Sequence, residues 1–181
     1  MGMAIRVPEL TIDDLDRMPD DGNRYELLDG MLLMTPAPSM GHQLFATALA
    51  VRLTADLDRS RACIVGPGAI QRGKRTQLQP DLLVFPARFA STKEWALVGE
   101  HWLAVEVLSR SSRVYDREFK RDAYFALGVK EVWLVDIARR AIEVCRSPGS
   151  GELVTDVIRW RVPSEKRIVS LDLQELFAAA E

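Results

Sequence analysis

Cysteine and histidine are scarce in this sequence, and their scarcity argues against two classes of small protein. The 181 residues contain Cys63 and Cys145, which are far apart and outside any CxxC pair, and only His42 and His101 as histidines. A zinc site would need all four side chains, without the short ligand spacing that zinc sites use. A disulfide framework has equally little support, so we expect free thiols in a cytoplasmic protein.

Long apolar runs and an excess of charge of one sign are also absent. No stretch reaches the 18 or so apolar residues of a membrane span, and no apolar segment typical of a signal peptide is evident at the N-terminus. We therefore expect no membrane partner. Lys and Arg total 24 against 26 Asp and Glu, a formal charge of -2. This balance excludes globally basic, histone-like binding of nucleic acid, but it leaves room for a local basic patch.

What is present is the composition of an ordinary globular protein, with 48% hydrophobic and 28% charged residues. This length suits one well-buried core, so we expect a single domain over residues 1–181. Apolar periodicity predicts helices and strands in alternation and therefore an α/β fold with a mixed sheet.

Local signals place the elements along the chain. A capping-box pattern at Thr11 predicts a helix that ends at about residue 18. The pair Asp29 and Gly30 between apolar runs predicts a hairpin with a type I′ turn, which needs positive φ at both positions. Ser39 is placed to cap a long helix. Further strands are expected at residues 63–65, 69–70, 82–85, 102–108 and 132–135, a helix at 112–127, a hairpin of 141–145 with 153–158, and a strand and helix within 171–180.

Glu106 stands in the middle of an otherwise apolar strand. Under strict alternation its side of the strand also carries Trp102, Ala104 and Leu108, so that face is apolar too. An unpaired buried carboxylate costs roughly several kcal/mol, so proteins usually keep such a group with a cation, a metal or a raised pKa. The simpler alternative is that Glu106 faces solvent or pairs with an arginine at the sheet edge.

Asp81 and Lys120 are the next candidates. Asp81 follows Pro80 at the start of a neighbouring strand, where an aspartate often marks only a turn. Two carboxylates on neighbouring strands would, however, suit a shared hard divalent cation. On a helical wheel Lys120 lies at the border between solvent and the expected core stripe, either as a snorkelling lysine or as an ammonium that steadies a phosphate or a hydroxide. The stripe consists of Tyr115, Phe119, Ala123 and Ala126.

His42 and Glu26 are weaker candidates. His42 lies near the start of its helix in line with Phe45 and Leu49, where a hydrogen-bonded histidine without a catalytic role is common. Glu26 lies in the first hairpin, and its side chain would be simply exposed on the simplest interpretation.

The ordered motifs are residues 25–30, 36–42, 80–81 and 105–109, then Asp116, Lys120 and Tyr124, then 128–129 and 131–136. Together they resemble the Uma-type putative restriction endonuclease family of the PD-(D/E)XK nuclease superfamily. The resemblance implies a restriction-endonuclease-like core, in which helices flank a central mixed β-sheet and a hairpin lies at the N-terminus. One departure is Leu108, which stands where the superfamily has a lysine. In the family that the chain resembles, the following helix supplies this lysine, and Lys120 is the matching position.

The resemblance implies a metal-dependent endonuclease that hydrolyses DNA phosphodiester bonds. Asp81, Glu106 and the backbone carbonyl of Val107 would bind Mg²⁺ or Mn²⁺, with Glu26 as an outer ligand. Lys120 would orient the attacking water or stabilise charge on the phosphate. His42 would contact phosphate or hold a carboxylate. Supporting roles fall to His42, Ser109 and Asp116.

Two basic clusters flank these residues in sequence and would bind the DNA backbone. They are Arg72, Lys74 and Arg75 before Asp81, and Arg110 and Arg113 after Glu106. The alternative is that both are ordinary solvated surface. A homodimer would let two sites face the two strands of a duplex.

Two other functions stay open on the sequence. The first is a catalytically inactive protein that keeps the nuclease fold and binds nucleic acid or regulates a partner. The second is a hydrolase of small phosphoesters that uses the same carboxylates in a closed pocket instead of an open basic groove.

Overall fold

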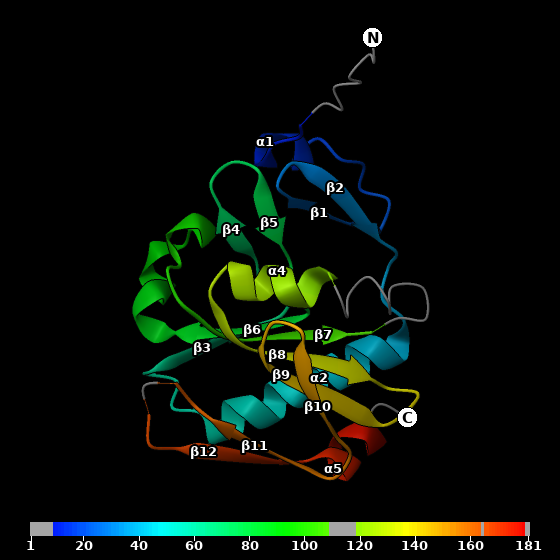
Figure 1. Cartoon of the computed structure of the whole chain (residues 1–181), viewed down its shortest axis with the longest axis vertical. Helices are drawn as coiled ribbons and strands as arrows, with labels where there is room; N and C mark the ends of the chain where they lie inside the picture. Colours follow the sequence, from blue (N-terminus) through cyan, green and yellow to red (C-terminus); the bar gives the residue numbers. More distant parts are fainter. Residues whose placement is uncertain (1–8, 109–118, 164, 180–181) are drawn as a thin grey trace.

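A six-stranded mixed sheet forms the centre of the protein, which we describe from a computed structural model (Figure 1). The structure describes residues 9–108, 119–163 and 165–179. The spatial order of the strands is β10 (Ser150–Val154), β9 (Ala141–Ser147), β8 (Val129–Asp136), β7 (His101–Val107), β6 (Leu82–Pro86) and β3 (Ala62–Val65). β7 and β8 run parallel, and the other neighbours are antiparallel. The predicted α/β class with a mixed sheet is confirmed.

Two smaller antiparallel sheets lie at opposite ends of the molecule in Figure 1. The upper one has the order β2 (Met31–Thr35), β1 (Arg24–Leu28), β5 (Thr76–Leu78) and β4 (Ile70–Arg72). The lower one pairs β11 (Val157–Arg161) with β12 (Ile168–Asp172). The sequence did not predict this division into three sheets, because apolar periodicity identifies strands but not their partners.

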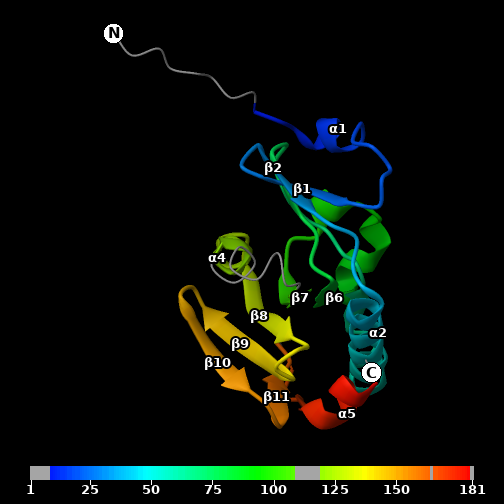
Figure 2. The same cartoon turned by 90° about the vertical axis from the view of Figure 1, so that its right-hand side faces the viewer.

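Helices cover both faces of the six-stranded sheet, as Figure 2 shows for α2 (Met40–Asp56) and α4 (Arg121–Ala126). The other α- and 3₁₀-helices within the described residues are α1 (Ile12–Leu15), α5 (Leu173–Ala178) and two 3₁₀ helices, η1 (Ala87–Thr92) and η2 (Trp95–Leu97). Along β6 the buried side chains alternate between two cores. Leu82 and Val84 join the core that contains Phe45 of α2, whereas Leu83 joins the core that contains Tyr124 of α4. Central strands covered on both faces explain the continuous apolar runs in the sequence.

The N-terminal turn signals are confirmed. Asp29 and Gly30, between β1 and β2, have φ angles of 51° and 83°, as a type I′ turn requires. The Ser39 side chain accepts a hydrogen bond of 3.3 Å from the backbone N–H of His42, and it therefore caps α2. The capping box at Thr11 is also present, although its helix ends at Leu15.

The predicted helix 112–127 is wrong in the face that it buries. Residues 112–118 lie outside the described residues, and α4 begins at Arg121. Phe119 is 38% exposed and Ala126 is exposed, whereas Lys120 and Tyr124 are buried. The helical wheel assigned the buried face to the apolar side chains. The face that is buried instead carries the polar groups of Lys120 and Tyr124, which both contact the buried Glu106 carboxylate.

The predicted strand at residues 153–158 is divided between two sheets. Val154 ends β10 and pairs with Ile142, whereas Val157 begins β11 and pairs with Asp172. The intervening Asp156 accepts a backbone hydrogen bond of 2.8 Å from Leu173. Two residues are enough for the chain to leave one sheet for another, and a period-2 pattern does not reveal such a bend.

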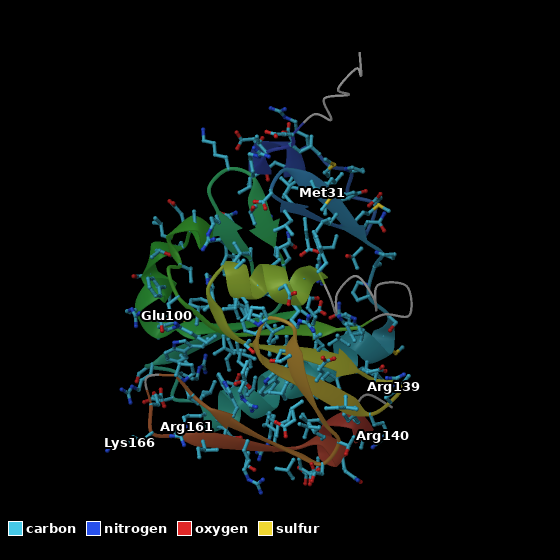
Figure 3. The ribbon with its side chains drawn as sticks, in the orientation of Figure 1. Met31, Glu100, Arg139, Arg140, Arg161 and Lys166 are labelled. Carbon is cyan, nitrogen blue, oxygen red and sulfur yellow. The ribbon has the colours of Figure 1, made fainter. Side chains whose placement is uncertain are left out.

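The turn between β8 and β9 contacts the C-terminal helix α5. Arg139 and Arg140, labelled in Figure 3, lie in this turn, close to α5. The Arg140 guanidinium lies 5.9 Å from the centre of the Phe177 ring, a cation–π distance. Across the ranges that the structure describes, no helix combines the length and the apolar character needed to span a bilayer.

Candidate active site

β6 and β7 bring Asp81 and Glu106 to one place. Leu82 pairs with Val105 in the antiparallel register, and extending this register by one residue puts Asp81 opposite Glu106. Side chains of directly opposed residues lie on the same face of a sheet. The backbone N–H of Val107 donates a 2.8 Å hydrogen bond to Asp81 Oδ2, which fixes the aspartate against β7. Both carboxylates are buried, with 6% and 3% exposure.

Arg24 and His42 hold the Asp81 carboxylate. Arg24 Nη1 lies 2.8 Å from Asp81 Oδ1, and His42 Nε2 lies 3.0 Å from Asp81 Oδ2. Burial acts to raise the pKa of Asp81, but the His42 hydrogen bond, the Arg24 charge and the Val107 N–H together outweigh it and lower the pKa. Asp81 is therefore ionised at neutral pH, the form that a metal or a cation binds. His42 holds a carboxylate, one of the two roles foreseen for it.

Lys120 is enclosed by two glutamates. Its Nζ lies 2.6 Å from Glu26 Oε2 and 3.2 Å from Glu106 Oε1, and the lysine is only 2% exposed. The hydroxyl of Tyr124, one helical turn further on, donates a hydrogen bond to Glu106. The prediction of a border position for Lys120 is therefore wrong. An ammonium tolerates this burial because carboxylates surround it.

Glu26 is a full member of this group of residues and not an exposed side chain. It is completely buried, and its Oε1 accepts a 2.6 Å hydrogen bond from the backbone N–H of Gln79. Arg24 and Glu26 are two residues apart on β1, so both side chains project from the same face of the strand. One short strand thereby supplies a cation for Asp81 and an anion for Lys120.

The electrostatics show that the three carboxylates share one region. Burial would lower the pKa of Arg24, but the charges of Asp81, Glu106 and Glu26 outweigh it and raise this pKa. Burial raises the pKa of Tyr124 well above its ordinary value, and the same three carboxylates raise it further. We call Glu26, Asp81 and Glu106, with their partners Arg24, His42 and Lys120, the carboxylate cluster.

Sequence reasoning overlooked Arg24 and Tyr124 as members of the site. Each carried a usable signal. Arg24 precedes Glu26 by two residues in a strand, and Tyr124 follows Lys120 by four residues in a helix, so each pair shares a face. Apolar periodicity does not draw attention to such residues, because it ranks positions by hydrophobicity.

Among the remaining predicted site residues, the structure describes Arg72, Lys74 and Arg75, and it does not bring these three into the cluster. Ser109, Arg110, Arg113 and Asp116 lie outside the described residues. Arg72 and Lys74 are exposed at the β4–β5 turn. Arg72 pairs with Thr76, which lies about 10 Å from Gln79 at 3.3 Å per residue, and Lys74 lies farther out in the turn. Arg75 in the same turn is engaged locally, since its Nη1 lies 2.6 Å from Glu9 Oε2 and its Nη2 donates a 2.7 Å hydrogen bond to the carbonyl of Asp29.

The donor chemistry of the cluster fits a hard divalent cation. Asp81 and Glu106 offer carboxylate oxygens from adjacent strands, and such cations prefer oxygen ligands. Among the described residues, no three or more Asp, Glu, His or Cys side chains are already arranged as a metal cage. Basic groups hold the acids instead, since Arg24 and His42 contact Asp81 and Lys120 contacts Glu106.

Comparisons with known proteins agree with this geometry. Residues 12–180 match the model of the family Uma2, described as putative restriction endonuclease. A crystal structure of a putative nuclease belonging to DUF820 from Anabaena variabilis ATCC 29413 superposes with a TM-score of 0.72 at 17% sequence identity, covering 95% of this chain and 99% of that one. A search of curated proteins finds no match. The likeness in structure shows the nuclease fold, and the family match, which spans nearly the whole sequence, shows that the chain belongs to the Uma2 family of putative restriction endonucleases.

Proposed function

We propose that this protein is a metal-dependent endonuclease that hydrolyses DNA phosphodiester bonds at the carboxylate cluster. The observation that carries the proposal is the burial of Lys120 between Glu26 and Glu106, beside Asp81. Stability alone does not explain these buried charges, because apolar side chains of similar volume are often at least as stabilising as a buried ion pair. Such groups are typical of sites that do chemistry.

Asp81, Glu106 and the backbone carbonyl of Val107 would hold Mg²⁺ or Mn²⁺. When bound, such an ion lowers the pKa of a coordinated water and neutralises charge that develops on the phosphate. Asp81 is already ionised and held in place by Arg24 and by the Val107 N–H. These contacts fix the orientation of the carboxylate at which a cation would bind.

Lys120 and Arg24 have separate roles in this proposal. The Lys120 ammonium, fixed by Glu26 and Glu106, orients the attacking water and offsets negative charge in the transition state. Arg24 and His42 both contact Asp81. Arg24 presents positive charge, and His42 a ring N–H group, to the phosphate next to the scissile bond. Tyr124 keeps its proton because its pKa is raised. Its hydroxyl therefore donates a hydrogen bond to the Glu106 carboxylate and holds this carboxylate in position.

Cleavage of plasmid and single-stranded DNA with Mg²⁺ or Mn²⁺ tests the proposal. Glu106→Gln and Lys120→Met should each reduce the rate by about 10²-fold or more, the scale of losing one charged group of a catalytic site. Glu131→Gln is the matched control, because Glu131 is also a buried glutamate of the central sheet but hydrogen-bonds with Trp133. It should retain the wild-type rate.

Two results would contradict the proposal. Wild-type protein that binds DNA without cleaving it under either metal would favour a catalytically inactive nuclease-fold protein. Equal rates in the wild type, Glu106→Gln and Lys120→Met would place the chemistry elsewhere.

A further inference from the structure

A cavity of about 370 Å³ opens beside the carboxylate cluster. It lies between α2 and the segment of Gly66 and Pro67, and Arg24, His42 and Asp81 line it. Its size is that of a small-molecule pocket. A duplex is far larger, so the cavity has room for one building unit of a nucleic acid and not for a base pair with its backbones.

The cavity is charged where it meets the cluster and largely apolar elsewhere. α2 lines it with the small side chains of Ala46 and Ala50, which leave space beside the helix. Ile64, Pro67 and Leu82 also line it. Apolar surfaces of this kind accept the face of a flat ring, as in enzymes that hold an unpaired base between apolar side chains.

The polar groups of the cavity fit an anionic, hydrogen-bonding ligand. Arg24 supplies positive charge next to Asp81, and the His42 imidazole lies 3.0 Å from the same carboxylate. Asp81 is the one acidic residue among the described residues that line the cavity. Gln43 and Thr47 add an amide and a hydroxyl, groups that can pair with the edge of a base. Phosphate at one end and a base along the rest is the chemistry of a nucleotide.

We propose that this cavity binds one unpaired nucleotide next to the scissile phosphate, so that the substrate is single-stranded or locally unpaired nucleic acid. The inference rests on the proposed function, since the cluster supplies the phosphate end of the cavity. Arg24 and His42 contact the phosphate, and the base lies against Ala46, Ala50 and Pro67.

Binding of a labelled single-stranded oligothymidylate, measured by fluorescence anisotropy in EDTA, tests the inference. Ala46→Trp fills the cavity from α2 and should weaken binding at least about ten-fold, the loss expected when one stacked base no longer fits. Ala55→Trp makes the same change on the same helix at an exposed residue away from the cavity. Its binding should stay within about two-fold of wild type. Equal binding by Ala46→Trp and wild type, or an equal loss in Ala55→Trp, would overturn the inference.

Two further arms keep the test decisive. Thr47 is exposed and also lines the cavity, so Thr47→Trp should fold and reproduce the loss if Ala46→Trp does not fold; normal binding by Thr47→Trp would then overturn the inference. In competition, thymidine monophosphate should displace the oligonucleotide at about ten-fold lower concentration than inorganic phosphate. Equal potency of the two competitors would show that the base has no site here.

The metal-free readout separates this inference from the proposed function. A wild-type protein that binds the oligonucleotide through the cavity but cleaves no DNA would contradict the endonuclease and leave the nucleotide site standing. If Ala46→Trp and Thr47→Trp both bind the oligonucleotide and cleave DNA as the wild type does, the nucleotide site is contradicted and the endonuclease stands.

Discussion

Replacement of Lys120 by methionine tests whether the carboxylate cluster is electrostatically interdependent. The change keeps most of the side-chain volume but removes the ammonium that lies 2.6 Å from Glu26 and 3.2 Å from Glu106. Both glutamates are almost fully buried, so each loses its nearby cation without gaining water. Removing one partner of a buried ion pair typically costs about 3–5 kcal/mol, and we expect Lys120→Met to lower the free energy of unfolding by this amount.

A second substitution should restore part of that loss. Glu26→Gln removes one of the two carboxylates and keeps an oxygen for the Gln79 N–H. In the double variant Lys120→Met with Glu26→Gln, Glu106 is the one of the two glutamates around Lys120 that remains charged. The double variant should therefore be about 1–3 kcal/mol more stable than the sum of the single changes predicts, the usual size of coupling between residues in contact.

Urea unfolding at neutral pH measures these differences through the transition midpoint at constant slope. Arg17→Met is the control, because Arg17 pairs with Asp14 at 3.3 Å but is 77% exposed. Exposed pairs contribute about 0–1 kcal/mol. A loss in Lys120→Met no larger than in Arg17→Met, or strictly additive effects in the double variant, would refute the reasoning.

Three more predictions concern other residues of the fold. Burial lowers the pKa of His101 to about 4 against the weaker, opposing charge of Glu100. Between pH 4 and about 6.5 the unfolded chain therefore binds more protons than the folded chain. The free energy of unfolding should fall by about 3 kcal/mol as the pH decreases from about 6.5 toward 4. Urea midpoints of His101→Gln across this range should lack that part of the pH dependence, and an unchanged pH dependence would contradict it. Gly66→Ala would place its Cβ 2.8 Å from the backbone carbonyl oxygen of Asp81, so both thermal stability and cleavage should fall, with about 1–3 kcal/mol lost from stability; unaltered values would show that the loop yields freely. Ser39→Ala removes the cap that precedes His42 and should cost about 1 kcal/mol in urea unfolding, whereas a loss below about 0.3 kcal/mol would mean that the cap contributes little.

Much of the fold was predictable because local chemistry determined it. The turn at Asp29 and Gly30 and the cap at Ser39 follow from backbone preferences that operate over a few residues. The buried runs of β6 and β7 follow from their unbroken apolar composition. What could not be predicted was strand pairing, because residues distant in sequence decide it. The passage from β10 to β11 at Asp156 is the clearest case.

The residues of the candidate site show the same contrast between local signals and contacts made by residues distant in sequence. Glu106 was recognisable because a carboxylate in an apolar strand is costly without a partner. Asp81 precedes its strand, and it indicated a site only together with Glu106 and the family resemblance. The partners themselves were harder to recognise. Lys120 is buried, although its helical-wheel position predicted a border residue. It tolerates burial because it forms an ion pair with Glu26, which belongs to a hairpin distant in sequence. Arg24 was overlooked for the same reason, since its importance depends on Asp81, which is distant in sequence.

The rate of plasmid nicking as a function of Mn²⁺ concentration tests the central claim most directly. We compare wild type with Asp81→Asn, which keeps the side-chain shape but weakens the proposed ligand, and with Glu131→Gln as the buried-carboxylate control. We expect saturable activation by Mn²⁺ in wild type and Glu131→Gln, and at least about 10²-fold less activity, without saturation, in Asp81→Asn. The same activation curve in Asp81→Asn and wild type would contradict the claim that Asp81 and Glu106 hold the metal at which DNA is cleaved.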